Sequence, residues 1–400
     1  MSEAPRIKGW CPGALRPMET GDGLVVRVRV LGGLLSPGRA LGLAQAARRH
    51  GNGLIDLSSR ANLQLRGITS EGLPAVQAVL ADLDLLDEDA ETEALRNIIA
   101  SPLAGIDPGL LIDVAAATRA LDAALRDTSD LRALPGKFGY LIDGGGLLPL
   151  DGVDADIRFV AVAPGRVRVE AGGFVAGTVP EEAIAPEALR LARLFLAERL
   201  PGERRMAAFM ARIAAPDTPR APIATASPAN ASLPYGLAAI PFGRLTADQL
   251  GGLARLAGDR GATLRLTPWR AILIDRPVAP GAIEGLDLLA TLDDPILRVE
   301  ACPGSPACRS GEAPTQADAR RLARDLAPWL REGVVVHVSG CAKGCARKAA
   351  ATVSLTASDG RYALAFDATA GAPRVTAPLS VEAAAQVIRS HFDTAEALHA

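Results

Sequence analysis

Four of the five cysteines in this chain of 400 residues lie in its last quarter, where they form two pairs. Five residues separate Cys302 from Cys308, and three separate Cys341 from Cys345. Gly, Pro, Ala and Ser fill most of both stretches, so the backbone can pass close to a bound group. Cysteine thiolates hold the irons of iron–sulfur clusters, whereas structural zinc sites use cysteine pairs separated by about two to four residues. The wider first pair therefore favours a [4Fe-4S] cluster held by these four thiolates, with structural zinc as the alternative.

The composition indicates a chain with a large hydrophobic core and nearly balanced charge. Hydrophobic residues make up 49% of the chain, the formal net charge is −2 and the pI is near 6.2. These values give no reason to expect a nucleic-acid partner. We find no run of about 18 apolar residues and no apolar signal-peptide core at the start, so we expect no membrane segment. Thiols in Gly-rich loops do not suggest a disulfide framework, which favours a cytoplasmic location.

The elements that must position the cysteines occur in two copies. Hydrophobic periodicity predicts strands and a helix in the first copy over 24–30, 39–50, 54–57 and 62–66. The same order returns over 235–241, 246–258, 263–266 and 271–274, with Thr246 as the expected N-cap of the helix. In this alignment Arg60 is matched with Arg270. Each copy is therefore expected to begin with a β-α-β unit.

A larger unit follows each β-α-β unit. The stretch from Arg96 to Pro102 matches the stretch from Arg298 to Pro303 when an offset of one residue is allowed. Helices are predicted over 108–126 and 315–331, followed by two strands and a helix in each copy: 157–163, 166–171 and 186–200, then 351–357, 361–366 and 380–392. The sequence thus predicts an α+β protein built by tandem duplication, with pseudo-two-fold symmetry and a site at the interface of the copies.

The expected division of the chain follows from this duplication. It comprises residues 1–95, 96–215, a linker over 216–234, 235–295 and 296–400. The linker is rich in Pro, Ala and Ser, which is typical of a segment without a core of its own. Only the second copy carries the cysteine pairs.

These motifs resemble the sirohaem and [4Fe-4S] nitrite and sulfite reductase family over nearly the whole chain. The cysteine pairs are the most specific part of the resemblance, which implies ferredoxin-like half-domains and a cluster in the second larger unit. Within the family, the stretches 11–24, 134–139 and 337–346 are similar to the branch of precorrin-3B synthases, oxygenases of aerobic cobalamin biosynthesis. That branch implies hydroxylation of precorrin-3A at C-20 with dioxygen and formation of a γ-lactone. A sirohaem-dependent sulfite or nitrite reductase is the alternative.

The resemblance also implies a set of basic site residues. Positions of a cage around sirohaem and its anion in the reductases match Arg60, Arg96 and Lys137, but the second lysine of that cage is Gly139 here. Loss of a proton-donating cation argues against anion reduction, and a glycine is expected to leave space for a bound tetrapyrrole. The predicted catalytic residues are Lys137, Arg96 and His337. The predicted carboxylate-binding and amide residues are Arg60, Asn62, Gln64, Arg66, Arg96, Asn97 and Lys137.

The cofactors and partners follow from the same resemblance. It implies the cluster and a mononuclear non-haem iron, with sirohaem as the alternative cofactor. It also implies an external electron donor, a reductase or ferredoxin supplied by NADH. Such an iron usually has two His and one carboxylate as ligands, and this chain has four His in all, so the triad is hard to assemble. His337 is a candidate ligand or acid–base group, and Cys11 is either a ligand, a substrate contact or a small buried hydrophobe.

The sequence argues against two other possibilities, a bound dinucleotide and a non-enzymatic electron carrier. Gly144-Gly-Gly146 lacks the spacing of a dinucleotide-binding loop, so no NAD or flavin site is expected. A non-enzymatic electron carrier would need the cluster but has no use for a set of carboxylate-binding cations. Arg60, Arg96 and Lys137 therefore favour an enzyme.

Overall fold

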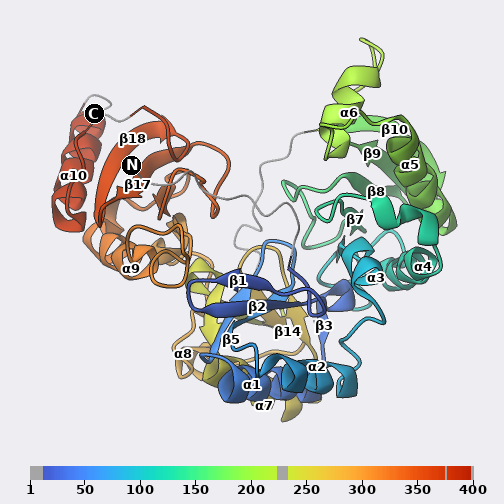
Figure 1. The fold of residues 1–400 in the computed structure, drawn as a ribbon, viewed down its shortest axis with the longest axis horizontal. Coiled ribbons are helices and arrows are strands. Elements are labelled where there is room, and N and C mark those ends of the chain that lie inside the picture. The colour runs from blue at the N-terminus through green and yellow to red at the C-terminus, as the bar shows by residue number, and fades with distance from the viewer. Residues whose placement is uncertain (1–11, 223–232, 374–375, 398–400) are drawn as a thin grey trace.

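The computed structural model describes residues 12–222, 233–373 and 376–397. Figure 1 shows a central part with one α/β unit on either side of it. The unit with β7 to β10 belongs to the first copy, and the unit with β17 and β18 belongs to the second. Among the described residues, every helix is too short or too polar to cross a lipid bilayer.

Two sheets that exchange a strand form the central part. The first has the order β1-β2-β5-β4-β12 and the second the order β11-β14-β13-β3. Strand β12 of the second copy pairs with β4 of the first, and β3 of the first copy pairs with β13 of the second. The half-domains are therefore joined by hydrogen bonds as well as by the chain. Their strands are β1 (Met18–Thr20), β2 (Gly23–Val28), β3 (Leu34–Leu35), β4 (Leu54–Leu57), β5 (Leu63–Ile68), β11 (Gly236–Ala239), β12 (Arg244–Thr246), β13 (Leu264–Leu266) and β14 (Ala271–Ile274).

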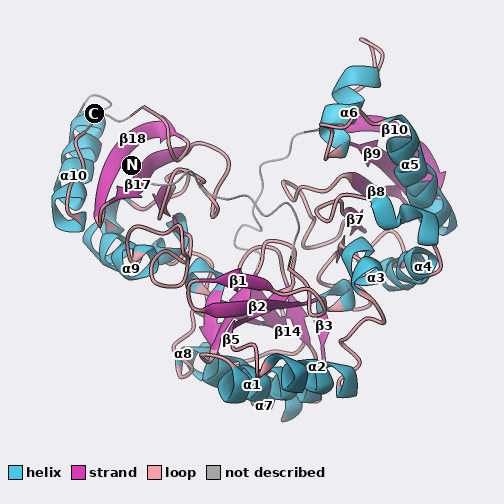
Figure 2. Cartoon of the chain, in the orientation of Figure 1, coloured by secondary structure: helices cyan, strands magenta, loops and turns pink. Residues whose placement is uncertain are grey.

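The helices α1 (Pro37–His50), α2 (Leu73–Asp82) and α7 (Ala247–Gly258) lie along one face of these sheets (Figure 2). Their start signals are local. The side chain of Ser36 accepts a hydrogen bond from the Arg39 amide, and Thr246, the predicted N-cap, also forms a capping box with Gln249. The turn before each helix also repeats, because Gly32 (φ 61°) and Phe242 (φ 60°) both adopt the left-handed conformation. The two copies thus share backbone geometry at positions whose side chains differ.

Each outer unit contains one sheet in which two parallel pairings lead into an antiparallel ladder. The first sheet has the order β10-β9-β8-β7-β6 and the second the order β15-β16-β17-β18. Their strands are β6 (Ile98–Ala100), β7 (Tyr140–Asp143), β8 (Ile157–Ala163), β9 (Arg166–Ala171), β10 (Phe174–Pro180), β15 (Val299–Ala301), β16 (Val336–Ser339), β17 (Ala351–Ser358) and β18 (Arg361–Ala368). The remaining α-helices are α3 (Ala90–Leu95), α4 (Val114–Arg126), α5 (Ile184–Glu198), α6 (Met206–Ile213), α8 (Pro280–Glu284), α9 (Thr315–Asp325) and α10 (Val381–Ala397).

The structure corrects two predicted helices. Helix α4 begins at Val114 rather than at 108, because the Asp113 side chain accepts a hydrogen bond from the Ala116 amide and caps the helix there. Helix α9 ends at Asp325 rather than at 331, where Pro328 lacks an amide hydrogen and a separate 3-10 turn follows. The strand β10 and the helices α2 and α6 were not predicted.

The structure also shifts the alignment of the copies by one residue. Leu57 pairs with Leu63 across the β4–β5 ladder, as Leu266 pairs with Ile272 across the β13–β14 ladder. Counting from these pairs, the residue of the second copy that corresponds to Arg60 is Trp269 and not Arg270. The left-handed residues agree, since Ala61 (φ 54°) then corresponds to Arg270 (φ 59°). The original alignment was wrong because it matched arginine with arginine across a turn whose conformation decides the register.

Candidate functional site

The two cysteine pairs follow neighbouring parallel strands of one sheet. Cys302 comes directly after β15, and Cys341 lies two residues after β16. These strands pair in parallel, with Ala301 opposite Val338, so their carboxyl ends meet at the same edge of the sheet. The fold therefore brings together loops that lie about 40 residues apart in the chain, as it does in other sheets of this kind.

The cysteine loops are packed so closely that side chains do not fit between them. A Cβ at Gly340 would lie 3.2 Å from the Gly311 Cα and 3.4 Å from the Cys302 Sγ. A Cβ at Gly311 would lie 2.6 Å from the Gly304 carbonyl carbon. The Gly340 amide donates a hydrogen bond to the Cys302 Sγ at 3.1 Å. Backbone donors aimed at sulfur are one of the means by which proteins tune an iron–sulfur cluster, so this cradle fits a cluster bound through thiolates.

The arrangement of the thiols does not match the usual ligand set of a single metal ion in the described part of the chain. Within the described ranges, no three His, Cys, Asp or Glu side chains come close enough together to hold one metal ion. A zinc site needs its ligands around one ion, whereas the ligands of a [4Fe-4S] cluster bind different irons and lie further apart. Although the Cys345 residue as a whole is exposed, desolvation of its thiol by the surrounding protein raises the pKa, the nearby Cys302, Cys341 and Cys308 raise it further, and Lys348 lowers it. The four thiols therefore share one electrostatic environment.

The first copy has the same loop geometry without cysteines. The Gly144 amide donates to the Ser101 Oγ at 2.9 Å, just as the Gly340 amide donates to the Cys302 Sγ. Ser101 follows β6 as Cys302 follows β15. The buried Asp143 carboxylate then accepts hydrogen bonds from the Gly145 and Leu150 amides at 2.9 and 2.8 Å. In this copy the Asp143 carboxylate thus accepts the hydrogen bonds of these loop amides.

His337 lies beneath the second cysteine loop. It is on β16, its side chain has no exposed surface, and neither ring nitrogen has a hydrogen-bond partner. A Cβ at Gly344 would lie 3.6 Å from its Cε1. Burial lowers the pKa of His337 to about 4; Glu300 acts in the opposite direction, while Arg347, Arg270 and Lys348 lower the pKa further. His337 is thus neutral at neutral pH, and its role as a catalytic group or ligand stays a prediction.

A bridge of charges that the sequence does not reveal lies beside His337. The Glu300 carboxylate accepts a hydrogen bond from Arg347 Nη1 at 3.1 Å and lies 3.5 Å from Arg270 Nη2. Arg347 follows Cys345 by two residues, and Arg270 belongs to the central part of the molecule. This bridge ties the second cysteine loop to the central sheets. Its signal in the sequence was weak, because arginine is common throughout the chain.

Arg60 and Lys137 lie where the central part meets the first outer unit. Arg60 Nη2 donates a hydrogen bond to the Lys137 carbonyl oxygen at 3.0 Å. The Lys137 side chain is exposed, and its ammonium has no hydrogen-bond or ion-pair partner among the described residues. Gly139 is buried, and a Cβ there would lie 3.2 Å from Arg60 Nη1. The space expected above Gly139 is therefore filled by the Arg60 guanidinium.

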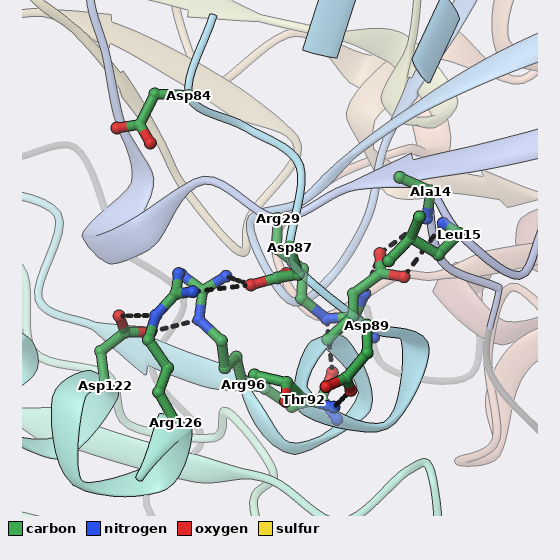
Figure 3. Close-up of polar contacts among 12 residues, drawn as sticks. Ala14, Leu15, Arg29, Asp84, Asp87, Asp89, Thr92, Arg96, Asp122 and Arg126 are labelled. Carbon is green, nitrogen blue, oxygen red and sulfur yellow. Dashed lines mark hydrogen bonds and ion pairs between the residues drawn. The ribbon is translucent and has the colours of Figure 1, made fainter. Parts of the chain in front are cut away.

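Arg66 and Arg96 are already engaged by carboxylates of the chain. Arg66 is 3% exposed and pairs with Asp22 and Asp56 at 2.8 and 3.0 Å. Figure 3 shows Arg96 beside Asp122 and Arg126, with ion pairs to Asp87 and Asp122. For these two arginines the substrate-binding role stays a prediction, and the observed contacts favour a structural role.

The predicted neutral hydrogen-bond donors Asn62, Gln64 and Asn97 also differ in their exposure to solvent. Asn97 is 3% exposed, and its amide group donates to the Ala94 and Phe138 carbonyls at 2.8 and 3.0 Å, which holds the loop that carries Lys137. Asn62 is buried, whereas Gln64 is partly exposed on β5. Cys11 lies outside the described residues. Of the predicted substrate-binding side chains, Arg60, Gln64 and Lys137 are thus the ones that reach solvent.

The non-haem iron finds no conventional site in the described part of the chain. No three potential ligands gather there around one point, and His337 is fully buried. We therefore derive no chemical step from such an iron.

Comparisons with known proteins agree with the fold. The family model described as the nitrite/sulfite reductase ferredoxin-like half domain matches residues 16–83 and 238–277, one segment in each copy. The chain is 32% identical over 398 residues to the precorrin-3B synthase of Sinorhizobium sp, an alignment that covers 91% of this chain and 83% of that protein. It is 27% identical to the ferredoxin–nitrite reductase of Synechococcus elongatus, covering 85% of this chain and 77% of that protein.

A solved structure extends the likeness to the arrangement of the elements. The Mycobacterium tuberculosis NirA protein matches with a TM-score of 0.69 over 91% of this chain and 79% of that one. The sequence identity is 19%, so this match describes the fold.

Replacing any one of the four cysteines by Ala should remove iron from the purified protein. We expect Cys302→Ala, Cys308→Ala, Cys341→Ala and Cys345→Ala each to lose most of the iron and acid-labile sulfide, because in the predicted cluster each thiolate would ligate its own iron. Iron and sulfide are measured after anaerobic purification. The matched control is Ser101→Ala, which alters the same loop position in the copy without cysteines and should keep both. Full iron in any of the four cysteine variants would contradict the ligand assignment.

Acid should destabilise the protein partly through His337. Its pKa in the folded protein is about 4, below the value of about 6.5 in the unfolded chain, so between these values the unfolded state binds the proton. The free energy of unfolding should therefore fall between pH 7 and pH 5 by about 2 kcal/mol more in the wild type than in His337→Leu. Leucine is the residue that the first copy has at this position, Leu141.

The measurement is denaturant unfolding at the two pH values. His391→Gln, at an exposed histidine, is the control and should keep the wild-type pH dependence. Equal pH dependence in the wild type and His337→Leu would show that His337 ionises in the folded protein.

Proposed function

The chain belongs to the nitrite and sulfite reductase family, and we propose that within this family of oxidoreductases it acts as a precorrin-3B synthase. In this proposal it uses dioxygen to hydroxylate precorrin-3A at C-20 and forms a γ-lactone from a side-chain carboxylate of the macrocycle. The relative named precorrin-3B synthase aligns at higher identity, and over more of both chains, than the nitrite reductase described above. The tetrapyrrole is then the substrate and not a resident cofactor.

The contact between Arg60 and Gly139 is the observation that carries this proposal. By the family resemblance, a reductase has a lysine at position 139, which supplies a cation and a proton close to a small anion. Here the Arg60 guanidinium packs over a glycine at that position. A guanidinium stays protonated at any physiological pH, so it binds carboxylates but does not deliver protons to a substrate. Loss of that lysine, with the guanidinium retained, suits a polycarboxylate ligand better than an anion that must be protonated many times.

The exposed basic and amide side chains have separate roles in the proposal. Arg60 is held by the Lys137 carbonyl, and its forked donors fit one carboxylate of the macrocycle in a bidentate manner. The Lys137 ammonium has no partner in the described chain and binds a second carboxylate. Gln64 supplies a neutral hydrogen bond. Together they orient the macrocycle by its periphery and leave its methine carbons free to react.

The cysteine cradle fits the second requirement of the reaction, a source of electrons. A bound [4Fe-4S] cluster supplies single electrons. We propose that Cys302, Cys308, Cys341 and Cys345 hold it and that a separate reductase or ferredoxin, supplied by NADH, delivers electrons to it. Cys345 is the exposed member of the set, with Lys348 close by, so this end of the cradle is open to such a donor.

A sirohaem-dependent reductase remains the competing function, because nitrite reductases also align over most of the chain. One anaerobic purification separates the two. We expect iron and sulfide without extractable tetrapyrrole, and conversion of precorrin-3A only when oxygen and an electron donor are supplied. Sirohaem in an acid–acetone extract, or reduction of nitrite or sulfite by the purified protein, would overturn the proposal.

Replacing Lys137 by Met should weaken substrate binding more than turnover. Loss of one charge-assisted contact to a carboxylate corresponds to about a tenfold rise in KM for precorrin-3A with a smaller change in kcat. Steady-state kinetics measure both constants. The control is Arg166→Met, which removes an exposed cation at the start of β9 and should leave KM unchanged. An unchanged KM in Lys137→Met would remove this residue from the substrate site.

A further inference from the structure

The first cysteine loop is held from outside at one backbone carbonyl. The carbonyl oxygen of Ala307, the residue before Cys308, accepts hydrogen bonds from the Gly21 amide and from Arg66 Nη2, both at 3.1 Å. Both donors belong to the central part of the molecule. Contact is close enough that a Cβ at Gly21 would lie 2.0 Å from the Pro306 carbonyl oxygen. The β1–β2 turn and β5 therefore bind the loop by hydrogen bonds next to Cys308, a candidate cluster ligand.

The Arg66 guanidinium that makes this contact is itself fixed. Asp22 accepts hydrogen bonds from its Nε and Nη2 at 3.0 and 2.8 Å, and Asp56 accepts one from Nη1 at 3.0 Å. Burial disfavours the charge of Arg66, but the two carboxylates outweigh this and raise its pKa. Such a planar group with all three nitrogens engaged has no freedom to rotate. The second hydrogen of Nη2 is directed at the Ala307 carbonyl oxygen.

The first outer unit is held in an equivalent way, with the arginine and the aspartate exchanged between the two corresponding positions. In the corrected alignment Asp56 corresponds to Arg265, and Arg66 corresponds to Asp275. Arg265 is 5% exposed, pairs with Asp275 at 3.2 Å and donates to the Pro102 and Ala104 carbonyls at 3.0 and 2.9 Å. Those carbonyls belong to the loop after β6, the counterpart of the cysteine loop. A buried arginine thus holds the loop of each outer unit, but only the loop held by Arg66 carries cysteines.

We propose that Arg66 and the Gly21 amide position the Cys302–Cys308 loop on the cluster. Arg66 is then a positioning residue for the cluster, in place of the substrate-binding role expected from the sequence. This inference rests on the cluster assigned under the proposed function. It does not depend on what the enzyme does with its substrate.

The expected consequence follows from the place of Ala307 in the chain. Its carbonyl belongs to the same planar peptide unit as the Cys308 amide, so movement of this carbonyl moves Cys308. Groups that hold a metal ligand in place commonly change metal affinity by about 10–100-fold when they are removed. The spectrum and potential of a cluster also depend on its hydrogen bonds and exposure to solvent. A loop released at Ala307 should therefore change both the retention and the spectrum of the cluster.

Two variants test the contact in different ways, each with a matched control. Arg66→Lys keeps the buried charge near Asp22 and Asp56 but loses the forked donors, and its control is Arg265→Lys, the same change at the arginine that holds the loop without cysteines. Gly21→Ala leaves Arg66 intact but places a methyl group against the Pro306 carbonyl. Its control is Gly38→Ala, at a position with no atom within 4 Å of the added Cβ.

The measurements are the rate of iron release to a ferrous chelator and the electron paramagnetic resonance spectrum of the reduced cluster, on protein purified without oxygen. We expect about tenfold faster release and an altered spectrum in Arg66→Lys and Gly21→Ala, and wild-type behaviour in both controls. Thermal unfolding shows whether each variant is folded. If one of the two test variants fails to fold, the other decides.

The outcomes separate this inference from the proposed function. Wild-type release rates and spectra in the folded test variants would overturn the positioning role while leaving the proposed function intact. Equal changes in Arg66→Lys and Arg265→Lys would also overturn it, because they would indicate general loosening of the fold. Wild-type protein without iron and sulfide would overturn the cluster assignment and this inference together. Failure to convert precorrin-3A would affect only the proposed function.

Discussion

The exchange of one strand between the two half-domains is the constraint on which the other features depend. Because β12 completes the first sheet and β3 completes the second, neither half-domain can move without breaking ladder hydrogen bonds of the other. The central part is thus a single rigid base for both outer units. Each outer unit is attached to it by buried groups, among them Arg265 on one side and Arg66 on the other. Loops far apart in the chain are consequently placed by one set of sheets.

The order of elements could be predicted from the sequence because most of them are strongly periodic. Strands over 54–57, 157–163, 166–171 and 271–274 agree residue for residue, and the capped helix after Thr246 begins where its cap places it. The exchange of strands could not be predicted, since β3 and β12 have two and three residues and carry no periodicity. The shift of one residue between copies was missed for a related reason. Residue type suggested one match, whereas the left-handed turn at Ala61 and Arg270 sets another.

The candidate cluster ligands could be predicted from the sequence, whereas the roles of the arginines near the site could be predicted less well. Cysteine spacing is a local property, and the loops after β15 and β16 carry all four candidate ligands. Arginine side chains are long, and their partners lie far away in sequence: Arg66 is 44 residues from Asp22 and 241 from Ala307. No local pattern distinguishes an arginine that faces a ligand from one that is buried against aspartates. Arg60 over Gly139 shows the same limit, because the effect of a glycine depends on which distant side chain packs over it.

The matching hydrogen bonds at Ser101 and Cys302 bear on the history of the chain. The two copies share one loop geometry but place different demands on the side chain in it. At position 101 any small side chain that accepts a hydrogen bond preserves the loop, whereas at position 302 only a thiolate would also ligate iron. Substitutions should accordingly accumulate faster around Ser101 and Asp143 than around the cysteine cradle. A lineage that lost its cluster would retain a foldable second copy, because the first copy demonstrates that the loop closes without iron.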